Sequence, residues 1–340
     1  MAGTPFRVLG SLLLAAAVGG CTSSASVIES RGGNTVQTGR IGAPNGGPEL
    51  YGEGVFSTGA WDFFVALEGD HRTAYLCRAS ADFSHFTILR TRLEDGRWTT
   101  PEVAPFSGRW SDADPHLSPD GTRMYFISNR PVAGGDEKRS DYDIWYVERT
   151  TVTAPWSEPA RLPSPVNADS STEWSPSVAA NGNLYFGAIR PGGKGNNDLY
   201  VARWANGAYA PPESIGDSVN TRADEVEPWV APDESYLIFS ARGRPDGIGG
   251  FDLYISRRRD TGWGTPQLLG NGVNSRAGDF NQSVSPDSRY LYFSSTRGFF
   301  ERAPSRPLTY AELERRLAGP GNGLGDIYRV EMARIGIGTR

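Results

Sequence analysis

The chain has 340 residues and a formal net charge of −5, from 34 Lys and Arg against 39 Asp and Glu. This small negative charge, with no Lys/Arg-rich run, gives no electrostatic basis for nucleic-acid binding. Glycine (42) and proline (24) are abundant and aromatic residues make up 11%, which is typical of many short strands joined by tight turns. Two domains would fit this length, but closed all-β folds often reach it as one domain.

The first residues resemble a targeting segment. Arg7 precedes an apolar run, residues 9–18, that is too short to span a bilayer. The run ends in Val-Gly-Gly before Cys21, which resembles a bacterial lipobox. We therefore expect residues 1–20 to be a lipoprotein signal peptide and Cys21 to carry lipid. The alternative is an ordinary signal peptide followed by an incidental cysteine.

The lipobox resemblance also implies a location. Thr22 stands where lipoproteins retained at the inner membrane often carry aspartate, so we expect a periplasm-facing protein anchored to the outer membrane by its lipid alone. Residues 21–48 are rich in Ser, Gly, Asn and Thr and are predicted to form a flexible tether. Only Cys77 would remain in the mature domain, so no intrachain disulfide is expected.

One sequence pattern recurs from about residue 57 to residue 331. An acidic residue precedes a Pro-Asp turn, a short apolar strand follows, and a further strand begins with aspartate. Equivalent aromatic positions of the apolar strands are 60, 53 and 54 residues apart at Phe126, Phe186, Phe239 and Phe293. Repeats of about this length with four short strands each are typical of propeller blades. We therefore predict one all-β domain, residues 49–334, a β-propeller of four-stranded antiparallel blades.

The Ser-Pro-Asp-Gly turn at 118–121 and strands such as Met124-Tyr-Phe and Asp143-Ile-Trp-Tyr resemble the WD40-like repeats of TolB-type propellers. This resemblance is specific for fold and weak for function, because propellers host many unrelated activities. Counting gives five blades. A sixth would need residues 30–57, which are poor in strand-forming residues. The last repeat lacks its fourth strand, so we expect an N-terminal strand, residues 53–57, to complete it and close the ring.

The last repeat carries an insertion, residues 299–324. Thr309 and Glu312 form a capping-box pattern and Gly319-Pro320 ends the segment, which predicts a helix near 309–318, from about 310 to 318. The helix could be a solvated decoration or a lid over one end of the channel.

An acidic residue enters each inner strand, and these five could ring one mouth of the channel as a binding site: Asp62, Asp112, Glu173, Glu225 and Asp279. Trp174 and Trp229 lie beside two of them and could stack on a sugar or grip a peptide. The structural alternative is that the acids pair between blades with arginines that follow the second strands, Arg130, Arg190, Arg242 and Arg297. The tryptophans would then fill gaps between blades.

No recognised catalytic motif, metal-ligand spacing or cofactor fingerprint occurs in the sequence, so we predict neither catalytic residues nor a metal or cofactor. Three hypotheses follow. The leading one is a membrane-anchored scaffold that binds an envelope protein or a cell-wall glycan. The second is a carbohydrate-active, glycosidase-like enzyme that uses a pair of channel carboxylates from the acidic ring, Glu173 with Glu225 or Asp112. The third is a purely structural envelope protein. Carboxylates paired with arginines would favour the scaffold, whereas an unpaired carboxylate pair facing an open pocket would favour the enzyme.

Overall fold

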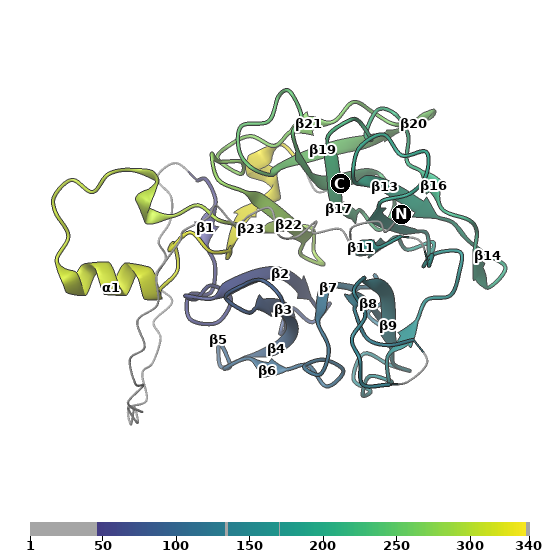
Figure 1. The fold of residues 1–340 in the computed structure, drawn as a ribbon, viewed down its shortest axis with the longest axis horizontal. Helices are drawn as coiled ribbons and strands as arrows, with labels where there is room; N and C mark the ends of the chain where they lie inside the picture. The colour runs from purple at the N-terminus through teal and green to yellow at the C-terminus, as the bar shows by residue number, and fades with distance from the viewer. Residues whose placement is uncertain (1–45, 133–134, 170, 338–340) are drawn as a thin grey trace, which may run out of the picture. The chain divides into compact units, whose positions relative to one another are not determined.

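The computed structural model describes residues 46–132, 135–169 and 171–337. These residues form a five-bladed β-propeller, in which four-stranded antiparallel sheets follow one another around a ring (Figure 1). The inner strands of the five blades contact each other in the order β2, β7, β11, β17 and β22, and β22 contacts β2 again. The predicted fold class and blade number are therefore confirmed. In the described residues, no helix is long and apolar enough to cross a membrane.

The first two blades follow the predicted order of strands from the inside outward. Blade 1 contains β2 (Trp61–Leu67), β3 (Thr73–Ala79), β4 (Phe86–Glu94), β5 (Arg97–Trp98) and β6 (Glu102–Val103). Blade 2 contains β7 (Asp112–Leu117), β8 (Arg123–Ser128), β9 (Asp143–Glu148) and β10 (Ala160–Arg161).

The next two blades have the same core with additions at the outer edge. Blade 3 contains β11 (Glu173–Val178), β12 (Leu184–Ala188), β13 (Asp198–Ala202) and β16 (Glu213–Ser214), with an extra hairpin of β14 (Trp204–Ala205) and β15 (Ala208–Tyr209). Blade 4 contains β17 (Asp224–Val230), β18 (Tyr236–Arg242), β19 (Asp252–Arg259), β20 (Gly262–Trp263) and β21 (Gln267–Leu268).

Blade 5 closes the ring. It contains β22 (Asp279–Val284), β23 (Tyr290–Ser295), β24 (Asp326–Glu331) and, as its outer strand, β1 (Glu49–Leu50). Glu49 lies opposite Arg329 and Leu50 opposite Tyr328. An N-terminal strand therefore closes the propeller as predicted. The predicted residues, 53–57, were wrong, because Gly52 and Gly54 adopt positive φ and turn this segment back on itself.

Ser57 fixes this turn against the last blade. Its fully buried hydroxyl accepts a hydrogen bond from the Ile327 amide at 2.9 Å and lies 3.0 Å from the Tyr51 carbonyl oxygen, to which it can donate. Ser57→Ala should lower the free energy of unfolding by about 1–3 kcal/mol, because the Ile327 amide would stay buried without that partner. Urea denaturation would measure the loss, with exposed Ser305→Ala as the matched control. Equal stability of the two variants would show that this contact contributes nothing to closure.

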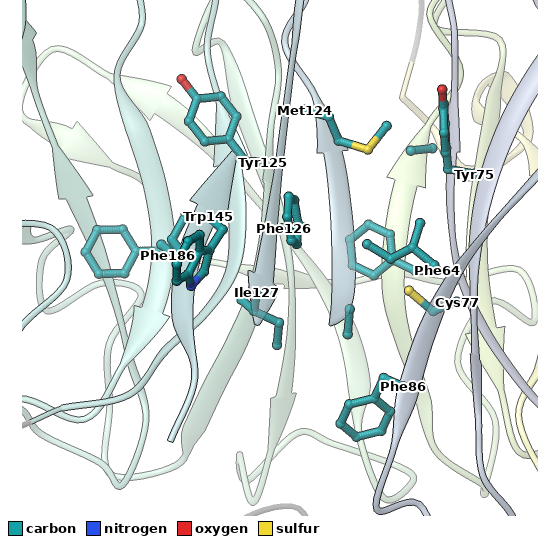
Figure 2. Packing of buried hydrophobic residues seen from close by; sticks show 14 of the residues in the cluster. Phe64, Tyr75, Cys77, Phe86, Met124, Tyr125, Phe126, Ile127, Trp145 and Phe186 are labelled. Atoms are coloured by element: carbon teal, nitrogen blue, oxygen red, sulfur yellow. The ribbon is translucent and has the colours of Figure 1, made fainter. Parts of the chain in front are cut away.

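The blades pack through aromatic and aliphatic side chains because each strand of the repeat carries them on both faces. Fully burying one such side chain contributes about 1.5–3 kcal/mol. The largest cluster joins blades 1, 2 and 3 and includes Phe280 of blade 5. Figure 2 shows the part around Phe126, with Trp145 and Phe186 on one side in that view and Phe64 and Cys77 on the other. Cys77 is buried and not disulfide-bonded, and its burial raises the pKa of the thiol.

Each inner strand contains a β-bulge, where its register against the second strand shifts. The residue inside each bulge has a φ between +46° and +57°, and these five residues are Phe64, Asp114, Ser175, Glu227 and Asn281. Positive φ is unfavourable for side chains other than glycine, and such strain tends to cluster at functional sites. The bulge residues, each two positions after an acid of the predicted ring, are therefore candidates for a functional site.

The insertion contains a short 3₁₀ turn, η2 (Phe299–Glu301), and the helix α1 (Tyr310–Ala318) with the predicted capping box between Thr309 and Glu312. A second 3₁₀ turn, η3 (Met332–Ile335), follows β24. No residue of α1 is buried, and Figure 1 shows it projecting outward beside blade 5. This placement supports the solvated decoration rather than the lid.

Candidate functional site

The five acidic residues that enter the inner strands are all fully buried, and each is paired with an arginine. The pairs and their N–O distances are Asp62–Arg78 at 2.6 Å, Asp112–Arg130 at 2.6 Å, Glu173–Arg190 at 2.9 Å, Glu225–Arg244 at 3.0 Å and Asp279–Arg297 at 2.7 Å. Burial raises the pKa of Asp62, Asp112, Glu173 and Glu225, although the neighbouring arginines act in the opposite direction. These contacts support the structural alternative, and a binding role for the ring stays an untested prediction.

The arginine pairing differs from the prediction in two respects. Each arginine lies in the same blade as its acid, whereas the prediction placed the pairs between blades. In blade 4 the partner of Glu225 is Arg244, while Arg242 pairs with Asp224 at 2.8 Å. The reason is that β18 extends to Arg242, so the arginine that reaches back to the inner strand comes two residues later.

The two predicted tryptophans have different surroundings. Trp174 is half-buried and packs on Tyr142 with ring centroids 5.3 Å apart, which fits the gap-filling alternative. Trp229 is only 8% exposed and packs on Tyr236, but its side chain also lines a cavity at the channel mouth. A binding role stays a prediction for both, and for Trp229 the cavity supports it.

Two carboxylates that the sequence analysis did not select lie inside the channel. Asp114 and Glu227 are the bulge residues of blades 2 and 4. Asp114 accepts hydrogen bonds through Oδ2 from the Ser175 amide at 3.2 Å and from the Ser175 hydroxyl at 2.6 Å. Glu227 accepts through Oε2 from the Asn281 amide and from the Ser240 hydroxyl, both at 2.7 Å. Asp114 is therefore held in place by the next blade of the ring, and Glu227 by Asn281 of the next blade and Ser240 of its own blade.

Neither carboxylate has a counter-charge. In the described part of the chain, no arginine, lysine or histidine forms an ion pair with Asp114 or Glu227, and the second oxygen of each carboxyl group accepts no hydrogen bond. Burial raises the pKa of Asp114 to about 6 and that of Glu227 to about 7, and the negative charge of Asp114 adds to the latter shift. Blades 2 and 4 are not neighbours, so this repulsion acts across the channel.

A cavity of about 350 Å³ lies where the inner strands end. It is lined by the last residue of every inner strand, Leu67, Leu117, Val178, Val230 and Val284. His116 also lines it, and burial lowers the pKa of this imidazole to about 4, so it is neutral at physiological pH. Asp114 and Glu227 precede the last residues of their strands by three positions, which places them deeper in the channel.

A larger groove of about 1050 Å³ adjoins this cavity between blades 2 and 3. The two share five lining residues: Ser118, Pro119, Asp120, Arg149 and Val178. The channel mouth and the groove are therefore continuous. Among the described residues, no cluster of three or more His, Cys, Asp or Glu side chains is arranged to hold a metal ion.

Solved structures resemble this chain only at low sequence identity. No family model and no curated protein matches the chain. Similar solved structures include a GH43 endo-arabinanase from Bacillus licheniformis (13% identity, 79% of this chain and 92% of the other, TM-score 0.46). An α-L-arabinofuranosidase from Lactobacillus brevis shares 13% identity over 82% of this chain and 92% of the other, TM-score 0.47. A Bacillus subtilis arabinanase shares 11% over 79% and 92%, TM-score 0.47.

These comparisons correct the leading functional prediction. The enzymes named above act on carbohydrate, which contradicts the prediction of a protein-binding or cell-envelope scaffold and agrees better with its carbohydrate-active alternative. At 11–13% identity and TM-scores of 0.46–0.47, this likeness assigns no activity to the chain. Asp114 and Glu227 were not predicted because only the acidic position common to all five repeats was considered as a site. The available signal was the variable position two residues later, which is a carboxylate in only two of five blades.

Proposed function

We propose that this propeller is a carbohydrate-active protein that hydrolyses glycosidic bonds with Asp114 and Glu227. The observation that carries the proposal is that Asp114 and Glu227 are channel carboxylates without an arginine partner among the described residues, unlike the five acids of the ring. Glycosidic hydrolysis requires one carboxyl group that is protonated and one that is ionised. Burial raises the pKa of both carboxyl groups toward neutrality, to about 6 for Asp114 and about 7 for Glu227, which allows one group to be protonated while the other is ionised.

The roles follow from these pKa values. Glu227, with a pKa of about 7, is substantially protonated at neutral pH and can donate a proton to the leaving oxygen. Asp114, with a pKa of about 6, is mostly ionised there and can act as the base. The hydrogen bonds to Oδ2 and Oε2 orient the two groups and leave Oδ1 and Oε1 for the substrate and water.

The cellular setting belongs to the same proposal. The Pro-Asp turns and aspartate-led strands support a TolB-type, WD40-like origin of the blades. Cys21 and the segments 1–20 and 21–45 lie outside the described residues. We propose that Cys21 carries the lipid that anchors the protein to the outer membrane on its periplasmic side. A cell-wall glycan is then the proposed partner of the channel.

The proposal is tested by measuring reducing ends released from a panel of polysaccharides and peptidoglycan. Asp114→Asn and Glu227→Gln keep the shape and the accepting oxygen, so each should retain the fold and reduce the rate about 10²–10⁴-fold. Wild-type activity should follow a bell-shaped pH profile with apparent pKa values near those of the pair, about 6 and about 7. The control is Glu102→Gln, which changes an exposed carboxylate in β6 at the outer side of blade 1. No hydrolysis by the wild type, or full activity in both variants, would refute the assignment.

A further inference from the structure

The groove between blades 2 and 3 has walls unlike those of the channel. It is lined by the Pro-Asp turn of blade 2 and by aromatic rings from both blades. Trp156 comes from the outer part of blade 2, and Trp204 and Tyr209 come from the extra hairpin of blade 3. At about 1050 Å³ the groove lies at the upper end of the ~300–1,000 Å³ range of ligand pockets, so it can take an oligomer rather than a single small molecule.

The hairpin β14–β15 positions the most exposed of these rings. Trp204 is 39% exposed and packs edge-on against Tyr209, with ring centroids 4.7 Å apart. The Trp204 amide donates to Asn183 Oδ1 at 3.0 Å. Its indole covers Gly182, where a Cβ atom would lie 2.9 Å from the ring. Because Gly182 also has a φ of +87°, a glycine there satisfies both the turn and the close approach of the tryptophan.

Tyr209 is fixed from the opposite wall. Its hydroxyl lies 3.1 Å from that of Tyr125 in blade 2, so the two phenols form a hydrogen bond across the interblade gap. Trp156 donates from Nε1 to the Tyr75 hydroxyl at 2.8 Å, and the guanidinium of Arg149 stacks 4.1 Å from its ring centroid. The aromatic walls are therefore ordered before any ligand arrives, which lowers the entropy cost of binding.

The charges of the groove balance one another. Two arginines, Arg123 and Arg149, and two acids, Asp120 and Glu148, line it. Arg123 pairs with Glu148 at 2.8 Å, and Arg149 pairs with Glu68 at 3.1 Å. An anionic ligand would have to compete with carboxylates that already occupy the arginines. A neutral ligand with many hydroxyl groups meets no such competition and can form hydrogen bonds at the charged and hydroxyl side chains of the rim.

We propose that this groove is a binding site for a neutral oligosaccharide or polysaccharide chain, which stacks a sugar ring on the exposed Trp204 and runs past Trp156. Aromatic rings that offer a flat apolar face between polar rims suit sugar rings, which have an apolar face and hydroxyl edges. The continuity with the channel mouth lets the chain run from the groove toward the ring centre. The groove does not depend on the catalytic role proposed for Asp114 and Glu227.

Binding is tested by native affinity electrophoresis in gels that contain arabinan, xylan or dextran, with polygalacturonate as the anionic comparison. At least one neutral polysaccharide should retard the wild type. Trp204→Ala should weaken that retardation at least tenfold in apparent Kd, and Trp204→Phe should restore part of it. The matched control is Tyr310→Ala, which removes an exposed ring on α1 without touching the groove.

Three outcomes overturn the proposal: no retardation by any neutral polysaccharide, unchanged retardation of Trp204→Ala, or stronger retardation by polygalacturonate. The catalytic proposal is separated from this one by its own variants. If Asp114→Asn abolishes hydrolysis but keeps the affinity, both proposals stand. If the wild type binds through Trp204 but hydrolyses nothing, the groove is supported and the catalytic role fails. If hydrolysis is found and KM does not change in Trp204→Ala, the groove fails alone.

Discussion

Replacing Asp112 by alanine is expected to lower the free energy of unfolding by about 3–5 kcal/mol, because removal of one partner leaves a buried charge without compensation. Arg130, the partner of Asp112, has a side chain only 9% exposed. Its remaining partners are the carbonyl oxygen of Phe106 and the hydroxyl of Ser128, which carry no negative charge. Chemical denaturation followed by tryptophan fluorescence would measure the loss.

The control uses an ion pair of similar geometry at the surface. Arg109 and Asp136 lie 2.6 Å apart with side chains 68% and 92% exposed, so Asp136→Ala should change stability by less than about 1 kcal/mol. The double variant Asp112→Leu with Arg130→Met should recover most of the loss, because it removes both buried charges. If Asp112→Ala were as stable as Asp136→Ala, the arginine–carboxylate pairs would not be what holds the inner strands to the following loops.

The stability of the protein is expected to fall as the pH rises from about 4 to above 7, with Asp114 and Glu227 among the causes. Their pKa values are raised in the folded state, from 3.8 to about 6 and from 4.5 to about 7. The native state therefore binds more protons than the unfolded chain in this range, and its advantage is full below the unfolded pKa and lost above the folded one. Each group contributes on the order of 3 kcal/mol over that interval.

The measurement is the difference in unfolding free energy between the wild type and Asp114→Asn at a series of pH values. The asparagine variant should match the wild type near pH 4 and exceed its stability near pH 8. Taking the difference matters because other groups titrate in the same range: burial raises the pKa of Asp326 to about 7 and lowers that of His116 to about 4, with opposite effects on stability. Parallel curves for the two proteins would mean that Asp114 ionises as freely in the fold as in the unfolded chain.

Higher stability of a variant that lacks the channel carboxylate would itself be informative. Groups kept for catalysis commonly cost stability, since they are held in unfavourable surroundings. Asp114 and Glu227 both have positive φ, desolvation raises the pKa of both carboxyl groups, and the charge of Asp114 raises that of Glu227 further. The neighbouring blades place serine, asparagine or phenylalanine at the same bulge, which shows that the fold does not require a carboxylate there. That contrast is what separates these two residues from the acid that every blade shares.

The blades could be predicted from the sequence because each turn and strand pattern recurs in several repeats, so a single irregular copy does not obscure it. The Pro-Asp turns, the aromatic strands and the capping box at Thr309 each correspond to a local hydrogen-bonding or packing rule, and α1 begins and ends where expected. The closing strand was misplaced because β1 has only two residues, Glu49 and Leu50, and its partners are in β24. A segment that short has no periodicity of its own.

The channel pair was missed for a different reason. In a regular strand, residues two apart share a face, so Asp112 and Asp114 would be expected to have equivalent surroundings. The bulge breaks that equivalence: Asp112 is turned to Arg130 within its blade, while Asp114 reaches Ser175 of the next one. Sequence spacing does not reveal a bulge made by a residue other than glycine. The arginine-paired Asp112 and the channel-facing Asp114 could therefore be distinguished only from the backbone conformation.

The pairing of β1 with β24 also sets an order in time. Glu49 and Arg329 form an ion pair, although 280 residues separate them in the chain. During synthesis from the amino end, β1 has no partner until β24 has left the ribosome. Of the described strands, the first to be made is therefore the last to pair. Domains whose key contacts are this distant in sequence close slowly. Until β24 pairs with β1, both β1 and the outer edge of the incomplete fifth blade are unpaired strand edges. Unpaired edges of this kind favour association with other chains.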